Sequence, residues 1–312
     1  MPGRPGAGLP RLKLSRGQIP AFAADAVWLY ALPMSEGADI RAAVVTLPGG
    51  VVSRGAMDRR EILLWALAAA AISFLVRNYF RMEGAERFAI FDSLAFAAAA
   101  MRLARCAPVA ARPADIGAAF AAAALAALGP NHAAGAALTL LSLTVLTSRD
   151  VNARAAGAVM LALAVHQLWS KILFAAVGPE IVKVDATLVG WATQLFVPGA
   201  TWTGNIITTS PTFSIVVEEG CSSFSNVSLA LLCYMSVSRL ERPEWRQGDL
   251  WVIGATCAVQ ILLNVARIFA MAQSYPLFQF WHDGAGAGIY AAAAAACAVL
   301  ISAVGTRLVG RT

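Results

Sequence analysis

Long apolar runs recur between residues 62 and 304 and are separated by short polar segments. Continuous apolar runs of this length, without the alternation of a surface strand, favour helices that are buried or face lipid. A helix needs about 20 residues to cross the hydrocarbon core of a bilayer. The pattern predicts eight membrane-spanning helices, at Ile62–Val76, Phe88–Met101, Ile116–Leu128, Ala134–Thr147, Ala155–Val177, Ser222–Val237, Leu250–Met271 and Gly286–Val304.

The composition favours the same fold class. Of the 312 residues, 59% are hydrophobic and 13% are charged, and the mean hydropathy is +0.66. Soluble domains carry about a quarter charged residues, so the chain is expected to be an all-α polytopic membrane protein. The third and fourth predicted spans are short and rich in alanine.

The positive charges cluster at the ends of the apolar runs. The net charge of +6 could indicate a nucleic-acid partner, but this placement is better explained by the excess of basic residues in cytoplasmic loops. Alternation of eight spans puts five clusters on one side: Arg59 and Arg60, Arg102 to Arg112, Arg149 and Arg154, Arg239 to Arg246, and Arg307 with Arg311. The prediction is an inner-membrane protein with both termini in the cytoplasm. The first outer loop fits less well, because it holds Arg77, Arg81 and Arg87.

Residues 1–56 differ from the rest of the chain. They are rich in proline, glycine and basic residues, and no run reaches spanning length. The expectation is a disordered cytoplasmic tail, or a segment that precedes the true start at Met57. Residues 57–312 would then form the membrane-embedded catalytic domain.

The predicted external loop, residues 178–220, has two parts. Ile181, Val184, Leu188, Trp191 and Leu195 follow three- and four-residue steps, which predicts an amphipathic helix that lies in the membrane interface or packs on the bundle. The segment after it has β-branched runs on either side of Ser210-Pro211, which predicts a small hairpin.

Cys221 is the one cysteine placed where a loop becomes a helix. The chain has five cysteines, an odd number, and Cys233, Cys257 and Cys297 fall inside apolar runs, so no disulfide framework is expected. A thiol at a helix N-terminus feels the positive end of the backbone dipole, which favours the thiolate. The alternative is that Cys221 is a small packing residue.

Two further polar groups are expected at the same end of the helices. Gln260, Asn264, Arg267 and Met271 share one face of the seventh predicted span, and His282 precedes the eighth. An arginine inside a span is costly and usually has a partner or a function, although Arg267 lies near enough to the end to extend toward the headgroups. Cysteine with histidine is the minimal pair for thiol catalysis, and a guanidinium can hold an oxyanion.

The order Cys221, Arg267, His282 resembles that of the exosortase/archaeosortase family of membrane cysteine transpeptidases. The resemblance covers about residues 155–304, and the segments EEGCSS, NVARI and WHDGAG carry it. It implies that Cys221 is the nucleophile, Arg267 the stabilising cation and His282 the proton-transfer residue. Ser223 stands where the family commonly has glycine. Glu218, Glu219, Ser222, Asn264 and Asp283 are candidate supporting residues.

The resemblance also implies a substrate class and a reaction. The substrates would be exported proteins whose C-terminal tail has a short motif, a membrane helix and a basic cluster. The acyl group would pass to an amine of a lipid or glycan, or to water, without a metal or an organic cofactor. The rival hypothesis is a transporter or lipid-binding protein in which Arg267 and His282 bind an anionic substrate. Asp92, His166 and Lys171 also lie in apolar segments but join neither set.

Overall fold

The computed structural model describes residues 57–81, 89–128 and 133–311. The expected tail of residues 1–56 and Phe88 lie outside this part of the chain. The helices are α1 (Arg59–Arg81), α2 (Ala89–Ala104), α3 (Pro113–Leu128), α4 (Ala133–Leu146), α5 (Val151–Ala164), α6 (Ser170–Phe196), α7 (Ser223–Glu241), α8 (Gly248–Met271), α9 (Tyr275–His282) and α10 (Ala285–Arg311). A five-residue π-helical turn, η3 (Val165–Trp169), joins α5 to α6, and a 3-10 turn, η4 (Glu219–Cys221), precedes α7.

Each of the eight predicted spans falls on helix in the described residues. By length and hydropathy, two of the described helices qualify as membrane-spanning segments, α8 and α10. Two further apolar helices, α3 and α4, are shorter. The chain is therefore mostly helical, as predicted.

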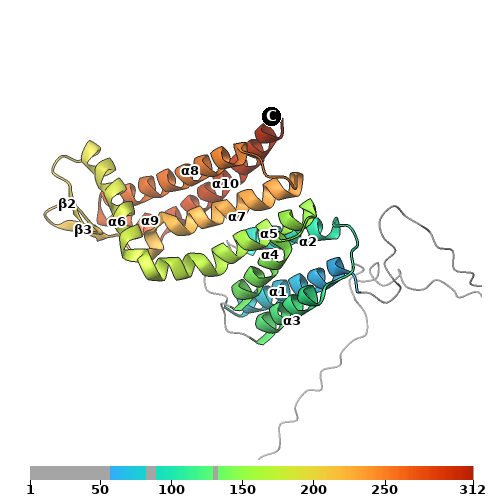
Figure 1. The fold of residues 1–312 in the computed structure, drawn as a ribbon. Helices are drawn as coiled ribbons and strands as arrows, with labels where there is room; N and C mark the ends of the chain where they lie inside the picture. Colours follow the sequence, from blue (N-terminus) through green and yellow to red (C-terminus); the bar gives the residue numbers. More distant parts are fainter. Residues whose placement is uncertain (1–56, 82–88, 129–132, 312) are drawn as a thin grey trace, which may run out of the picture. The chain divides into compact units, whose positions relative to one another are not determined.

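Helices α7, α8 and α10 run side by side, with the sheet at one end and residue 311 at the other (Figure 1). Small residues allow the helices to approach closely. A Cβ atom at Gly305 of α10 would lie 2.3 Å from a methyl carbon of Val252 in α8. The position therefore requires glycine for this packing.

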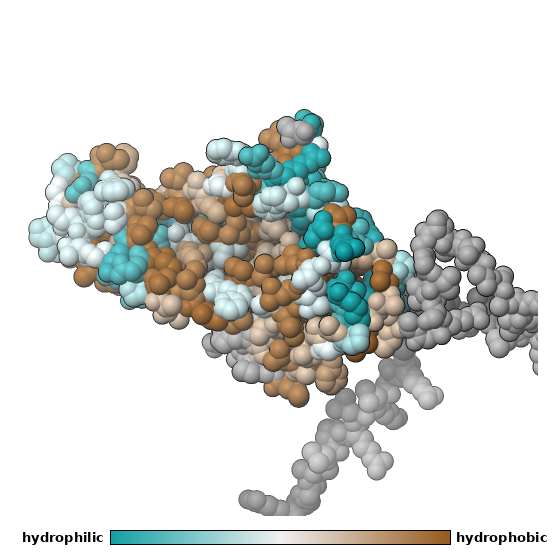
Figure 2. Space-filling model, viewed as in Figure 1, coloured by the Kyte–Doolittle hydropathy of each residue, from teal (hydrophilic) through white to brown (hydrophobic). Residues whose placement is uncertain are grey.

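The surface exposes large apolar side chains. Trp65, Phe120 and Trp251 are 78%, 78% and 81% exposed. Apolar residues spread over the helices in Figure 2, and hydrophilic residues gather toward the end that carries the C-terminus. Such a surface would be unfavourable in water and suits contact with lipid.

Helix α6 combines the end of the fifth predicted span with the predicted external helix. The fifth predicted span continues through η3 into α6, and the predicted external helix forms the second half of α6 after a bend at Val177 (φ −130°, ψ 15°). Pro179, two residues later, lacks a backbone N–H and disturbs the helix around it.

The predicted external helix buries the face opposite to its large apolar residues. Val184, Trp191 and Leu195 are exposed, whereas the buried face is made of small residues and one acid, Asp185. The exposed face is the one expected to meet the membrane interface.

The segment before Cys221 forms three strands, not the two of the predicted hairpin. Strands β1 (Thr201–Thr203), β2 (Ile206–Ser210) and β3 (Phe213–Val216) form an antiparallel sheet in the order β1-β2-β3. The β2–β3 turn lies at Pro211, as predicted. The β1 strand was missed, although Gly204 (φ +60°) before Asn205 is a favourable pair for a two-residue turn. Ile207 pairs with Ile215, and both are buried in the cluster that contains Cys221.

A buried ionic cluster holds the other end of α7 and α8. The Asp249 carboxylate is fully buried and accepts hydrogen bonds from Tyr234, Arg239, Arg242 and the backbone N–H of Arg246. The Arg239 guanidinium is 2% exposed and lies 2.9 Å from Asp249. Each buried charge is thus paired, as burial in a low-dielectric interior requires.

Replacing Asp249 with alanine should lower the free energy of unfolding by about 3–5 kcal/mol, because it leaves Arg239 buried without a counter-charge. The measurement is the unfolding of the purified protein in detergent. Lys183→Ala is the control. It removes an exposed ion pair with Glu180 and should cost less than about 1 kcal/mol. Equal losses would mean that the cluster at Asp249 contributes no more than a surface pair.

Candidate functional site

Cys221 lies in the turn between the sheet and α7. It ends η4, and Ser222 is the N-cap of α7, with a side chain that accepts a hydrogen bond from the N–H of Phe224. Cys221 is 4% exposed and packs in an apolar cluster with Ile268 and Met271. The sequence predicted a cysteine in the first turn of the helix; it lies just before that helix and is buried.

Asp185 anchors the residues that follow Cys221. Its carboxylate accepts three hydrogen bonds: from the Ser222 hydroxyl at 2.7 Å, the Ser223 N–H at 3.0 Å and the Ser223 hydroxyl at 2.6 Å. Asp185 is 3% exposed. The contacts of Ser222 and Ser223 explain two of the small polar residues after Cys221, because they hold the start of α7 against α6.

The backbone on the other side of the thiol is held by α8 and α10. The Asn264 amide donates to the carbonyl of Cys221 at 2.7 Å, and its oxygen accepts from the Tyr290 hydroxyl at 3.1 Å. That hydroxyl accepts a hydrogen bond from Asn226 of α7 at 2.8 Å. Side chains from α7, α8 and α10 thus form one hydrogen-bonded chain, which ends on the backbone carbonyl of Cys221.

Arg267 lies in the same polar centre. Its Nε donates to the carbonyl of Trp281 at 3.1 Å, and its guanidinium carbon lies 4.7 Å from the ring centroid of Tyr290. Arg267 is half-buried, and Gln260, Asn264 and Met271 on the same face of α8 are buried. The predicted polar face therefore points into the bundle, where a cation on an aromatic ring is stabilised.

His282 is the last residue of α9 and follows Trp281, the residue that Arg267 contacts. Its Nδ1 lies 2.8 Å from Asp283 Oδ1, and its ring stacks on Phe278 with centroids 4.9 Å apart. Its side chain is 38% exposed. In the described part of the chain, no hydrogen bond joins His282 to Cys221, so their predicted proximity stays a prediction.

The two acids before Cys221 are exposed. Neither Glu218 nor Glu219 forms an ion pair with Arg267 or His282 among the described residues. The carbonyl of Glu218 accepts a hydrogen bond from the N–H of Cys221 at 2.9 Å. Their contribution to this turn comes through the backbone.

The remaining polar residues in apolar segments lie elsewhere. His166 of η3 shares a hydrogen bond with Ser228 of α7 at 2.9 Å, and Gln167 donates to Asp92 of α2 at 2.8 Å. Lys171 is exposed. These contacts join α2, η3 and α7 and do not include Cys221. Across the described ranges, no group of three or more histidine, cysteine or acidic residues is placed to hold a metal ion.

Burial raises the pKa of the Cys221 thiol above its ordinary value of 9.0, whereas the positive charge of Arg267 lowers it. Glu218 and Asp283 act in the same direction as burial. Burial therefore opposes the thiolate that a helix N-terminus is expected to favour, and the thiolate stays a prediction. The cost of removing a charged sulfur from water exceeds the opposing effect of Arg267. This direction favours the protonated thiol at neutral pH.

Four contributors to this centre were missed in the sequence. Asp185 falls in the predicted amphipathic helix, Asn226 and Tyr290 fall in predicted spans and were given no role, and Trp281 acts through its backbone carbonyl. Only Asp185 had a usable signal: it is the one acid between the apolar positions Val184 and Leu188 of that helix.

The fold and the site together define a helical membrane protein with a buried cysteine whose backbone joins a network of polar side chains. The family model for transmembrane exosortases matches residues 62–299, which is more than half of the chain. The chain therefore belongs to the exosortase family of membrane cysteine transpeptidases. The comparison with curated proteins and the comparison with solved structures each give no match.

Alkylation of Cys221 should be slow at pH 7 and should rise about tenfold per pH unit to beyond pH 9, because the thiolate reacts and the pKa is raised. The rate is measured with iodoacetamide in a variant whose other four cysteines are alanine. Arg267→Met should slow alkylation at each pH, since loss of the positive charge raises the pKa further. A fast rate with a plateau near pH 7 would contradict a protonated resting thiol.

Proposed function

We propose that this protein cleaves the C-terminal sorting tail of exported proteins through an acyl-enzyme on Cys221. The observation that carries the proposal is that Cys221, buried just before α7, lies close enough to the half-buried Arg267 of α8 for its charge to act on the thiol. The match to the transmembrane exosortase family supports it, because the match spans both residues and His282. Exported proteins with C-terminal sorting signals are the substrates that membership implies.

The proposed orientation puts this centre at the outer face of the inner membrane. Eight spans with both termini in the cytoplasm place the sheet, α9 and Cys221 outside and Arg239 to Arg246 inside. The length of α7 supports the arrangement, since 19 residues rise about 28 Å, close to the thickness of the hydrocarbon core. A substrate tail that spans the membrane would present its motif beside Cys221.

The first step is attack of the Cys221 sulfur on the scissile carbonyl. Because the resting thiol is protonated, a base must take its proton as the carbon–sulfur bond forms. His282 has the chemistry for this role. Asp283 at its Nδ1 favours the tautomer with the proton on that nitrogen, which leaves Nε2 as the acceptor. Catalytic hydrogen bonds often tighten only when substrate binds.

The second step breaks the carbon–nitrogen bond. Arg267 would stabilise the oxyanion of the tetrahedral intermediate; its Nε is held by Trp281, and its two terminal nitrogens are left to face substrate. His282 would then protonate the leaving amine, which departs with the membrane helix and basic cluster. An amine of a lipid or glycan, or water, attacks the thioester and releases Cys221.

Cys221→Ala, Arg267→Ala and His282→Ala should each leave the protein inserted in the membrane and abolish tail removal, because each lacks one of the three chemical groups. Arg267→Lys should also lose at least about a hundredfold in rate, since an ammonium cannot replace the planar guanidinium. The measurement is the gel mobility of a co-expressed substrate with a sorting tail.

Cys257→Ala and Cys233→Ala are the matched controls and should process at the wild-type rate, because both lie within helices away from the polar centre. A transporter or lipid-binding protein would tolerate Cys221→Ala and remain sensitive at Arg267 and His282. Continued processing by Cys221→Ala would therefore refute the nucleophile and the proposed function with it.

A cysteine placed at Gln247 should resist an impermeant maleimide in intact cells and react once the membrane is permeabilised, because the α7–α8 connection is assigned to the cytoplasm. A cysteine at Thr212, in the exposed β2–β3 turn, is the control and should react from outside. Both are placed in a background without the native cysteines. Labelling at Gln247 from outside would contradict the proposed topology.

A further inference from the structure

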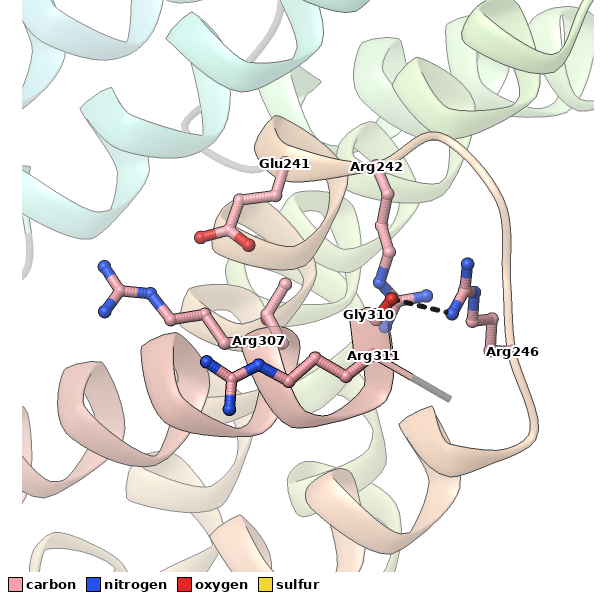
Figure 3. Close-up of a pocket in the computed structure, with 7 residues that line it drawn as sticks. Glu241, Arg242, Arg246, Arg307, Gly310 and Arg311 are labelled. Atoms are coloured by element: carbon pink, nitrogen blue, oxygen red, sulfur yellow. Dashed lines mark hydrogen bonds between the residues drawn. The ribbon is translucent and has the colours of Figure 1, made fainter.

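A basic pocket lies at the end of α7 that is farthest from Cys221. It has a volume of 360 Å³ and lies between the α7–α8 connection and the last turns of α10 (Figure 3). Its lining residues are Glu241, Arg242, Arg246, Thr306, Arg307, Gly310 and Arg311. Four arginines and one glutamate thus line the pocket, and the catalytic mechanism uses none of them.

Part of this pocket is rigid. Arg246 donates to the carbonyls of Val309 and Gly310 at 2.7 and 3.2 Å, which ties the α7–α8 connection to α10. Arg242 is held by the buried carboxylate of Asp249. The pocket is therefore built on the same ionic cluster that stabilises the ends of α7 and α8.

Two buried polar atoms in the wall have no partner in the described part of the chain. They are Nε of Arg242 and the hydroxyl oxygen of Thr306, and Thr306 is 1% exposed. A buried donor without a partner costs free energy and is rare. Arg307 and Arg311 are exposed and donate no hydrogen bond to described residues. The wall therefore offers more donors and positive charge than the single carboxylate of Glu241 can match.

We infer that this pocket binds a phosphate group, such as the headgroup phosphate of an anionic phospholipid in the cytoplasmic leaflet. Guanidinium groups recognise phosphate through paired, charge-assisted hydrogen bonds, and the donors at Arg242 and Thr306 would complete its coordination. Basic pockets between membrane helices at the cytoplasmic side are typical sites for such headgroups. Exposed apolar residues lie nearby in the sequence: Trp245 in the α7–α8 connection, Leu250 in α8 and Leu308 in α10. These side chains suit contact with the acyl chains.

Charge placement for topology alone would also put arginines at this end. It does not explain a walled pocket with two buried donors left unpaired. A basic peptide, including the basic end of a sorting tail, is an unfavourable occupant because four arginines would repel it. The inference stands on this pocket and does not need Cys221 to be catalytic.

The test titrates the purified full chain in detergent with phosphatidylglycerol, phosphatidylcholine and inorganic phosphate, and follows binding by native mass spectrometry. Phosphatidylglycerol should bind wild type at least about tenfold more tightly than the double variant Arg307→Gln/Arg311→Gln. The matched control, Arg105→Gln/Arg154→Gln, removes the same charge at the same end of the bundle but outside this pocket, and should bind like wild type.

Thr306→Val separates a ligand role from a structural one. It removes a hydroxyl that has no partner among the described residues, so the thermal stability of the lipid-free protein should stay equal or rise. Affinity for phosphatidylglycerol should nevertheless fall about threefold or more. A variant that loses stability and keeps its affinity would count against the site.

The ligands distinguish the source of the phosphate. Binding of phosphatidylglycerol without inorganic phosphate would identify a lipid site, and displacement of the lipid by inorganic phosphate would identify a site open to soluble phosphates. Equal lipid affinity in wild type and the pocket variant, or equal losses in the pocket and control variants, would overturn the inference. Continued processing by Cys221→Ala would refute the proposed function but would leave the lipid-binding result unaffected.

Discussion

The hydrogen bonds of Asp185 are the interaction on which the site depends. A carboxylate buried in a membrane protein is stable only when its charge is matched by donors. Here the donors are the Ser222 and Ser223 groups at the start of α7, so satisfying the acid also fixes that helix end. Cys221 directly precedes Ser222 in the chain, so the same hydrogen bonds help to fix the position of its thiol.

The opposite side of the thiol follows from the same need to satisfy buried polar groups. Asn264 is 1% exposed and uses both ends of its amide, one on the Cys221 carbonyl and the other on Tyr290. Tyr290 in turn supplies the ring against which Arg267 rests. Because each group is satisfied by the next, displacement of one would leave another buried without a partner. This coupling keeps the cation near the sulfur without an ion pair between them.

The sequence predicted the helices better than the site because the two depend on different information. Apolar runs and arginine placement are local patterns, and they located the helices and the polar face of α8 that carries Asn264 and Arg267. A local pattern marks Asp185 only as an acid within the predicted external helix; its partners could not be found this way, since they lie 37 and 38 residues along the chain. The strand β1 was missed because three residues are too few for a pattern. The state of the thiol depends on burial, which a helix-end argument leaves out.

A protonated thiol at rest is compatible with nucleophilic chemistry and constrains how that chemistry begins. A thiolate exposed in an oxidising compartment would be open to oxidation, whereas a buried thiol is less reactive. The charge that makes it a nucleophile must then be created when a substrate and a base arrive. Arg267 is already in place to favour that charge, and it has the largest effect that opposes burial on the pKa of the thiol. The His282 side chain is less buried than the thiol and is accessible to water. The three residues of the proposed mechanism thus differ in exposure: Cys221 is buried, Arg267 is half-buried, and the His282 side chain is 38% exposed.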